Sequence, residues 1–313
     1  MGLAEFSKKS KDVIRPFGQI DTLLYYGIVA EKLKKYLAGK EIAAKIWLGK
    51  KGFMPYLIKR GSKLTPLYIE EFKDITPEFL ELRLKLRNLN VAVGKINKTQ
   101  AKLWEYFLPR HLSDLLYACN NEGAKKPIER LFFDIDRGNV KAEDAQKAAA
   151  RLVEVMNADD KFWELVKGEL FLMWTGGSFH VYVFLKKEIP ISVYDNYIAY
   201  SKNDPLASFT GKWAKKINDE LKIKVIGGHE KQEGMINIDP SQTPSGKLSR
   251  APFSLHMKDE NTIDGVALPL SLSMIKDKSL INELRKYNPK RVISELNELS
   301  KRLPKNPGGG KNG

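Results

Sequence analysis

The scarcity of cysteine and histidine limits the chemistry that this chain can carry. Its 313 residues include one cysteine, Cys119, and four histidines. A single cysteine excludes an intrachain disulfide, a zinc site built on several cysteines and an iron–sulfur cluster. No apolar run is long enough to cross a bilayer, and the first residues lack the apolar core of a signal peptide. These absences predict a cytoplasmic protein without a membrane partner.

Acidic residues are also in the minority. The chain has 53 lysines and arginines against 38 aspartates and glutamates, which gives a formal net charge of +15. This excess predicts a polyanionic partner, with nucleic acid or nucleotides first. Lysine supplies 41 of the 53 basic residues and glutamine occurs only five times. That bias is also typical of thermophilic proteomes, in which lysine keeps the surface soluble, and both interpretations stay open.

The pattern of apolar residues predicts a mixed α+β (α/β) fold. Residues 1–110 read mostly as helix, with a short strand-like stretch at 54–58. From residue 130 the pattern changes to short apolar strands, at 131–136, 170–174, 180–185 and 236–239. Helical segments are expected at about 141–156 and 187–222. The two strands around Thr175-Gly176-Gly177 read as a hairpin. A chain of this length can form one large domain or two smaller ones.

The C-terminal part of the chain has clear helix signals. Asn288-Pro289 reads as an N-cap followed by a first-turn proline, and Pro304 ends the apolar stripe that follows. The stripe consists of Val292, Leu296, Leu299 and Leu303. Residues 305–313 have the composition of a linker. This segment is either a connection to further domains or a plain disordered tail.

Three carboxylates on two apolar strands carry most of the functional information. Asp134 and Asp136 lie in Leu-Phe-Phe-Asp-Ile-Asp, and Asp239 ends Ile-Asn-Ile-Asp. Alternate residues of a strand share a face, so Asp134 and Asp136 lie opposite Phe133 and Ile135. Carboxylates are depleted from strands, and three of them suit a divalent cation such as Mg²⁺ or Mn²⁺. Ion pairing at the surface is the alternative.

Two segments rich in turns contain further candidate ligands. Ser178 and His180 share a strand face beside a glycine-bearing turn, where a hydroxyl, an imidazole and backbone N–H groups could cradle phosphate oxygens. A structural role is the alternative for His180. Further along, Arg250, His256 and Lys258 supply three donors within nine residues. His256 and Lys258 share strand parity, so both could point at one triphosphate.

Taken in order, these motifs resemble those of the archaeo-eukaryotic primase superfamily. The order is Asp-x-Asp at 134–136, Ser-x-His at 178–180, an apolar-flanked Asp239, and Ser-Leu-His-x-Lys at 254–258. The sequence is most similar to the catalytic small subunit of archaeal and eukaryotic primases and to the primase–polymerases of archaeal plasmids. The resemblance spans about residues 20–260. It implies an RRM-like sheet packed with a second α/β unit, plus a helical insertion.

The resemblance also implies a role for each motif residue. Two Mg²⁺ or Mn²⁺ ions would be bound by Asp134, Asp136 and Asp239. The triphosphate of the incoming nucleotide would be contacted by Ser178, His180, Arg250, His256 and Lys258. The chain departs from the family in two ways: glycine is usual at the position of Ser178, and many members carry a cysteine-rich zinc knuckle between the first two motifs. Residues 137–177 contain neither cysteine nor histidine, so no zinc site is predicted.

In these terms residues 1–265 are expected to form a primase–polymerase catalytic domain. It would have a helix-rich start at 1–110, a motif-bearing core at 130–260 and a helical insertion at about 187–222. Residues 266–304 would form a C-terminal helical segment, and residues 305–313 the linker-like tail.

The predicted function is that of a DNA primase and DNA polymerase. It would add ribo- or deoxyribonucleotides to a primer, or start de novo, on single-stranded DNA. Its partners would be the template, nucleoside triphosphates and a primase large-subunit-like domain or subunit. One rival is a non-catalytic replication module that binds single-stranded nucleic acid. The other is a metal-dependent nuclease or glycosyltransferase that uses the same aspartates.

Overall fold

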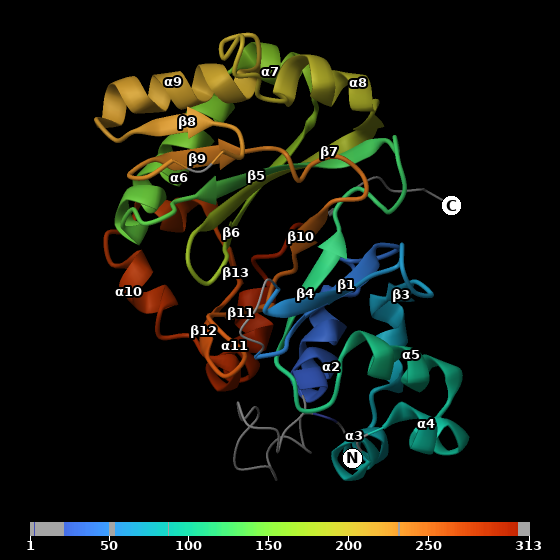
Figure 1. The fold of residues 1–313 in the computed structure, drawn as a ribbon. Helices are drawn as coiled ribbons and strands as arrows, with labels where there is room; N and C mark the ends of the chain where they lie inside the picture. Colours follow the sequence, from blue (N-terminus) through green and yellow to red (C-terminus); the bar gives the residue numbers. More distant parts are fainter. Residues whose placement is uncertain (1–2, 4–21, 50–53, 87, 231, 306–313) are drawn as a thin grey trace. The chain divides into compact units, whose positions relative to one another are not determined.

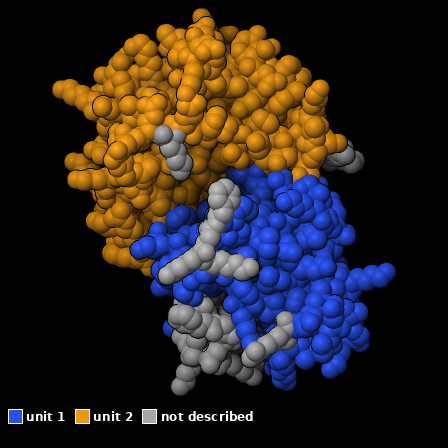
Figure 2. Space-filling model, in the orientation of Figure 1, with its two compact units in different colours: residues 1–118, 248–267, 287–301 blue, residues 119–247, 268–286, 302–313 orange. Residues whose placement is uncertain are grey.

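The chain forms two compact units, each assembled from separate stretches of sequence (Figure 2). The computed structural model describes residues 3, 22–49, 54–86, 88–230 and 232–305, so most of the predicted linker-like tail lies outside the described residues. Unit 1 combines Met1–Ala118, Leu248–Ala267 and Tyr287–Lys301, and unit 2 combines Cys119–Lys247, Leu268–Lys286 and Arg302–Gly313. Both units contain helices and sheets, which confirms the predicted α+β class (Figure 1). Residues after 265 are divided between the two units.

Unit 1 is built on a five-stranded antiparallel sheet. Its order is β10-β4-β1-β2, with β3 also paired to β1. The strands are β1 (Glu41–Trp47), β2 (Tyr56–Lys59), β3 (Leu67–Tyr68), β4 (Ser113–Ala118) and β10 (Leu248–Arg250). A separate antiparallel ladder joins β11 (Leu255–Met257) to β12 (Ile263–Val266).

The prediction of a mostly helical start missed strand β1. Its sequence contains the alanine pair at 43–44, and alanine is the strongest helix former. Both alanines are fully buried in the sheet, so pairing with β4 and β2 outweighs their helix propensity. The strand-like stretch expected at 54–58 corresponds to β2.

Helix α2 (Thr22–Leu33) is mostly apolar and buried over all but two of its residues. Tyr25 and Tyr26 on α2 donate hydroxyl hydrogen bonds of 2.8 and 2.6 Å to the carbonyl oxygens of Phe253 and Ser113. The other helical elements of the unit are η1 (Ile69–Asp74), α3 (Pro77–Lys85), α4 (Leu89–Ala92), η2 (Val93–Lys95), α5 (Lys98–Tyr106) and α11 (Pro289–Ser300). Of these, η1 and α11 contact α2.

Helix α11 begins where the sequence predicts. The Asn288 side chain accepts a hydrogen bond from the Arg291 N–H, as an N-cap does. Three residues of the predicted apolar stripe, at 292, 296 and 299, are buried. This helix contacts α2, so the C-terminal segment completes the core of unit 1.

Unit 2 contains a six-stranded sheet in the order β13-β6-β7-β5-β9-β8. Its strands are β5 (Ile128–Asp136), β6 (Gly168–Trp174), β7 (Phe179–Ile189), β8 (Val225–Gly227), β9 (Ile236–Asp239) and β13 (Leu268–Leu270). All neighbours are antiparallel except β8 and β9, which are parallel. The four predicted strands of this region and the hairpin of β6 and β7 are confirmed.

Two long helices cover one face of this sheet (Figure 1). Helix α6 (Ala142–Asn157) contacts β5 and β7, and α9 (Phe209–Leu221) contacts β8 and β9. The ring of Phe133 on β5 lies 5.8 Å from that of Trp213 on α9. Because adjacent residues of a strand point to opposite faces, Asp134 and Asp136 lie on the face away from these helices.

The remaining helical elements of unit 2 are short. They are α7 (Asp160–Leu165), α8 (Ile191–Val193), the π-helix η3 (Tyr194–Ile198), η4 (Leu272–Lys276) and α10 (Leu280–Leu284). Together α8, η3 and α9 occupy the segment in which a helical insertion is predicted. None of the described helices combines the length and the apolar character that a membrane span requires.

Candidate active site

One row of polar residues crosses three strands of the unit 2 sheet. Asp134 on β5 is paired in register with His180 on β7 and with Asp239 on β9. Directly opposed residues of antiparallel strands point to the same face, so these three side chains share the face away from α6 and α9. Asp136 lies on that face too, opposite Asn237. The structure therefore brings the three predicted aspartates and His180 together on one surface of one sheet.

Two of the carboxylates accept hydrogen bonds from their own turns. Asp239, with 9% of its surface exposed, accepts from the N–H and the hydroxyl of Ser241 at 2.8 and 3.0 Å. Asp136 accepts from the Gly138 N–H at 3.1 Å. Among the residues that the structure describes, no three histidine, cysteine, aspartate or glutamate side chains are placed so that they could hold a metal ion.

The donor set nonetheless fits a divalent cation by its chemistry. Carboxylate oxygens are the hard ligands that Mg²⁺ and Mn²⁺ prefer. Like charges at neighbouring positions repel one another, and a bound cation relieves that repulsion. Because the described side chains are not grouped closely enough to hold an ion, binding of one ion by all three carboxylates requires a change in their side-chain conformations.

His180 is held between an acid and a phenol. Its Nε2 lies 3.5 Å from Oδ1 of Asp134, and its Nδ1 lies 3.2 Å from the hydroxyl of Tyr182. The ring of Phe132 packs edge-on against the imidazole, with centroids 4.7 Å apart. The side chain is only 7% exposed. Tyr182 is not among the residues predicted from the sequence. Because residues two apart on a strand share a face, its position two residues after His180 would have placed it on the same face.

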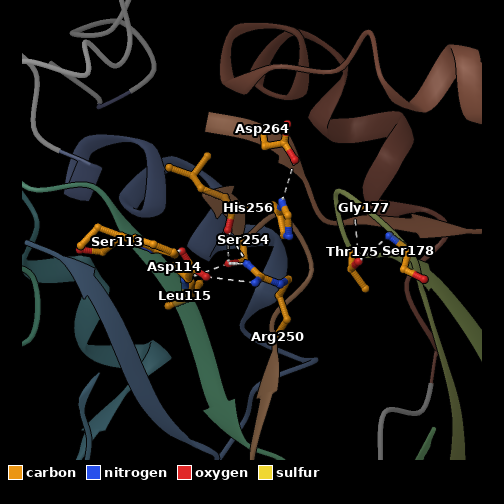
Figure 3. A network of polar contacts seen from close by, with 12 residues as sticks. Ser113, Asp114, Leu115, Thr175, Gly177, Ser178, Arg250, Ser254, His256 and Asp264 are labelled. Atoms are coloured by element: carbon orange, nitrogen blue, oxygen red, sulfur yellow. Dashed lines mark hydrogen bonds and ion pairs between the residues drawn. The ribbon is translucent and has the colours of Figure 1, made fainter. Parts of the chain in front are cut away.

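The turn between β6 and β7 satisfies its own amides. The N–H groups of Gly177 and Ser178 donate to Oγ1 of Thr175 at 3.4 and 3.0 Å (Figure 3). The hydroxyl of Ser178 donates to the carbonyl oxygen of Ile135. Gly176 has a φ of +103°, a conformation that favours glycine. The amides that we expected to cradle phosphate are thus directed at the threonine hydroxyl.

A tyrosine of the helical insertion lies near Asp239. The hydroxyl of Tyr194 on η3 donates to the carbonyl oxygen of Pro240 at 3.2 Å. Burial raises the pKa of Tyr194, and the charges of Asp239 and Asp195 raise it further. This phenol therefore remains neutral and anchors the turn after β9.

Arg250, predicted as a phosphate ligand, forms an ion pair with a buried carboxylate of unit 1. Its Nη2 lies 3.0 Å from Oδ2 of Asp114, and its Nη1 donates to the carbonyl oxygen of Leu255 at 2.6 Å (Figure 3). The Asp114 side chain is 1% exposed and also accepts a 3.0 Å bond from the indole N–H of Trp47. Sequence reasoning missed Asp114, a carboxylate in an apolar strand like Asp134.

His256 and Lys258 differ in environment. Nδ1 of His256 lies 3.6 Å from Oδ2 of Asp264. Burial lowers the pKa of this imidazole to about 4, and the positive charge of Arg250 is the second largest cause of the lowering. Lys258 is exposed in the bend after β11. The register shifts between His256 and Met257, and Lys258 lies beyond the strand. The predicted strand therefore ends at Met257 and does not reach Lys258, and a shared direction of the two side chains stays a prediction.

The predicted site residues are thus divided between the units. Unit 2 contains Asp134, Asp136, Ser178, His180 and Asp239, whereas unit 1 contains Arg250, His256 and Lys258.

Comparison with known proteins identifies the fold. No protein-family model matches the chain, and no curated protein matches it. Among solved structures it is similar to the polymerase domain of Ligase D from Mycobacterium tuberculosis in complex with DNA, with a TM-score of 0.51. The likeness covers 90% of this chain and 92% of that one at 16% sequence identity. At this identity the likeness shows a shared fold, that of a polymerase domain.

Proposed function

We propose that this protein is a DNA-directed nucleotidyltransferase of the archaeo-eukaryotic primase type, which makes or extends primers on single-stranded DNA. The observation that carries the proposal is the row of His180, Asp134 and Asp239 across β7, β5 and β9, with Asp136 on the same face. The fold is shared with a polymerase domain solved with DNA. The net charge of +15 suits a polyanionic template.

In this proposal Asp134, Asp136 and Asp239 hold two Mg²⁺ or Mn²⁺ ions. Bound there, such ions would stabilise the charge that develops on the attacking and leaving oxygens. The carboxylates act as ligands and do not transfer protons. His180 presents an imidazole beside them, and Ser178 a hydroxyl oxygen that retains acceptor capacity. Catalysis then consists mainly of positioning and charge neutralisation.

The proposed reaction extends a primer by one nucleotide. The oxygen of the primer 3′-hydroxyl forms a bond to the α-phosphorus of a nucleoside triphosphate. The bond from that phosphorus to the β-bridging oxygen breaks, pyrophosphate leaves with the electron pair, and the hydroxyl proton passes to water. Contacts of Arg250, His256 and Lys258 with the triphosphate, and a large-subunit-like partner, stay predictions from the sequence.

The first prediction concerns the aspartate pair. Asp134→Ala and Asp136→Ala should each lower nucleotide incorporation on a primed single strand more than about 100-fold. Loss of a residue that only hydrogen-bonds to a metal ligand typically lowers metal affinity or activity about 10–100-fold, and loss of a direct ligand should lower it further. Labelled nucleotides and Mg²⁺ or Mn²⁺ make the measurement, and a chelator should abolish incorporation. Wild-type activity in either variant would remove the proposal.

Asp144→Ala is the matched control for this experiment. Asp144 lies on α6 and pairs with Lys147 at 2.8 Å, so its loss removes a carboxylate away from the row. This variant should retain incorporation. The same preparations, incubated with DNA alone or with sugar nucleotides, separate the rivals. A non-catalytic DNA-binding module gives no product, a nuclease shortens DNA, and a glycosyltransferase consumes the sugar nucleotide.

A further inference from the structure

Tyr182 is a buried phenol in an aromatic cluster beside the candidate site. Its side chain is 0% exposed. The rings of Phe132, Phe171 and Phe184 lie 5.0, 5.8 and 5.9 Å from its own. These rings fix the position of the phenol, and its hydroxyl lies 3.2 Å from Nδ1 of His180. A buried tyrosine hydroxyl needs a hydrogen-bond partner, and the imidazole nitrogen provides one.

The two neighbours of His180 favour one position for its ring proton. A carboxylate only accepts hydrogen bonds, so Asp134, whose Oδ1 lies 3.5 Å from Nε2, favours a hydrogen on Nε2. In that tautomer Nδ1 presents a lone pair toward the Tyr182 hydroxyl, 3.2 Å away. The opposite tautomer would turn the Nε2 lone pair toward a carboxylate, which is electrostatically unfavourable.

We propose that Tyr182 is a positioning residue, whose hydroxyl donates to Nδ1 of His180 and keeps the ring proton on Nε2, facing the aspartate row. The function of this arrangement rests on the proposed nucleotidyl transfer. A neutral imidazole donates a hydrogen bond only from the nitrogen that carries the proton. With the proton fixed on Nε2, His180 is a donor on the side where the aspartates would hold the nucleotide's phosphates. Without the phenol only Asp134, at 3.5 Å from Nε2, still favours this tautomer, so the fraction of molecules that presents a lone pair there rises.

The test uses Tyr182→Phe in the full-length protein, a change that keeps the aromatic packing and removes the hydroxyl. Nitrogen-15 shifts of labelled histidine rings report the tautomer at a pH where the ring is neutral, and His180→Gln assigns the His180 signals. We expect the wild-type shifts of a protonated Nε2 and an unprotonated Nδ1. Tyr182→Phe should move both shifts toward a mixture of tautomers. It should also raise the KM for the nucleotide about tenfold, in the range of outer-sphere substitutions, with a smaller change in kcat.

Tyr106→Phe is the matched control. Tyr106 is also fully buried, and its hydroxyl donates to the Thr65 carbonyl oxygen at 3.0 Å within unit 1. This variant should leave the His180 shifts and the KM unchanged. A wild-type ring protonated on Nδ1, or unchanged shifts in Tyr182→Phe, would overturn the inference. Lack of incorporation by the wild type would count against the proposed function instead, and the ring shifts would still decide the role of Tyr182.

Discussion

At the scale of single residues, His256 has the clearest electrostatic signature. Its side chain is 28% exposed, with Nδ1 close to Asp264. Burial and the cations of Arg250 and Lys45 lower the pKa of this imidazole to about 4, and the charges of Asp114 and Asp264 oppose them. His256 is therefore neutral at pH 7. As a phosphate ligand it would bring a hydrogen-bonding group and no charge.

The depressed pKa predicts how stability depends on pH. Between pH 6.5 and about 4, the unfolded chain binds a proton at His256 that the folded chain does not. Above pH 6.5 the imidazole is neutral in both states and does not lower the free energy of unfolding. As the pH falls from 6.5 to about 4, protonation of the unfolded chain lowers the free energy of unfolding by on the order of 3 kcal/mol. Urea unfolding at pH 7.5 and 4.5 measures it. His256→Gln should lose less stability between these pH values than the wild type, and equal losses would contradict the assignment.

Residue type and strand position alone do not separate a structural carboxylate from a candidate ligand. Asp114 and Asp134 both interrupt apolar strands. The first is buried against Arg250 and Trp47, whereas the second is 34% exposed beside His180. The sequence flagged Asp134 because a second aspartate follows at the same parity. The environments of the two carboxylates differ through partners contributed by other strands, which one sequence does not reveal.

At the scale of elements, the β6–β7 hairpin depends on the Thr175 side chain. Its Oγ1 accepts from the amides of Gly177 and Ser178, and Thr175 is 7% exposed. Thr175→Val keeps the shape but leaves these amides without that acceptor. It should lower the free energy of unfolding by about 1–3 kcal/mol, as measured by urea denaturation. Thr175→Ser retains the oxygen and should lose much less. Equal losses in the two variants would exclude this role.

Elements with strong local signals were predictable, and those that depend on distant partners were not. The alanine-rich α6, the capped α11 and the apolar strands of unit 2 follow from periodicity and turn residues. Strand β1 contains good helix formers and becomes a strand because β4 pairs with it from residues 113–118. The shifted register at His256 likewise arises from pairing with β12, which parity along one strand cannot predict.

At the scale of the whole molecule, both units need residues beyond 265. Strand β13 pairs with β6 in unit 2, and α11 packs against α2 in unit 1. The buried side chains contributed there include Leu268, Leu270, Val292, Leu296 and Leu299. Losing one buried leucine side chain commonly costs 2–5 kcal/mol, whereas a whole domain is stable by about 5–15 kcal/mol. The two units therefore share their dependence on the C-terminal residues.

A chain ending at Gly265 should consequently fail to unfold cooperatively, because both cores would be incomplete. Thermal unfolding followed by near-UV circular dichroism checks this. A chain ending at Lys305, which keeps β13 and α11, should unfold at nearly the wild-type temperature. A cooperative transition in the shorter chain would show that residues 1–265 fold as a domain, as the sequence suggests.

The chain passes between the units at residues 118/119, 247/248, 267/268, 286/287 and 301/302. During synthesis on the ribosome, α2 emerges long before α11, which packs against it. The apolar surface of α2 that α11 covers therefore stays uncovered until residues 289–300 have been synthesised. Exposed apolar surface makes nascent chains prone to aggregation. Overproduction of this protein should therefore depend on slow synthesis, low temperature or chaperones.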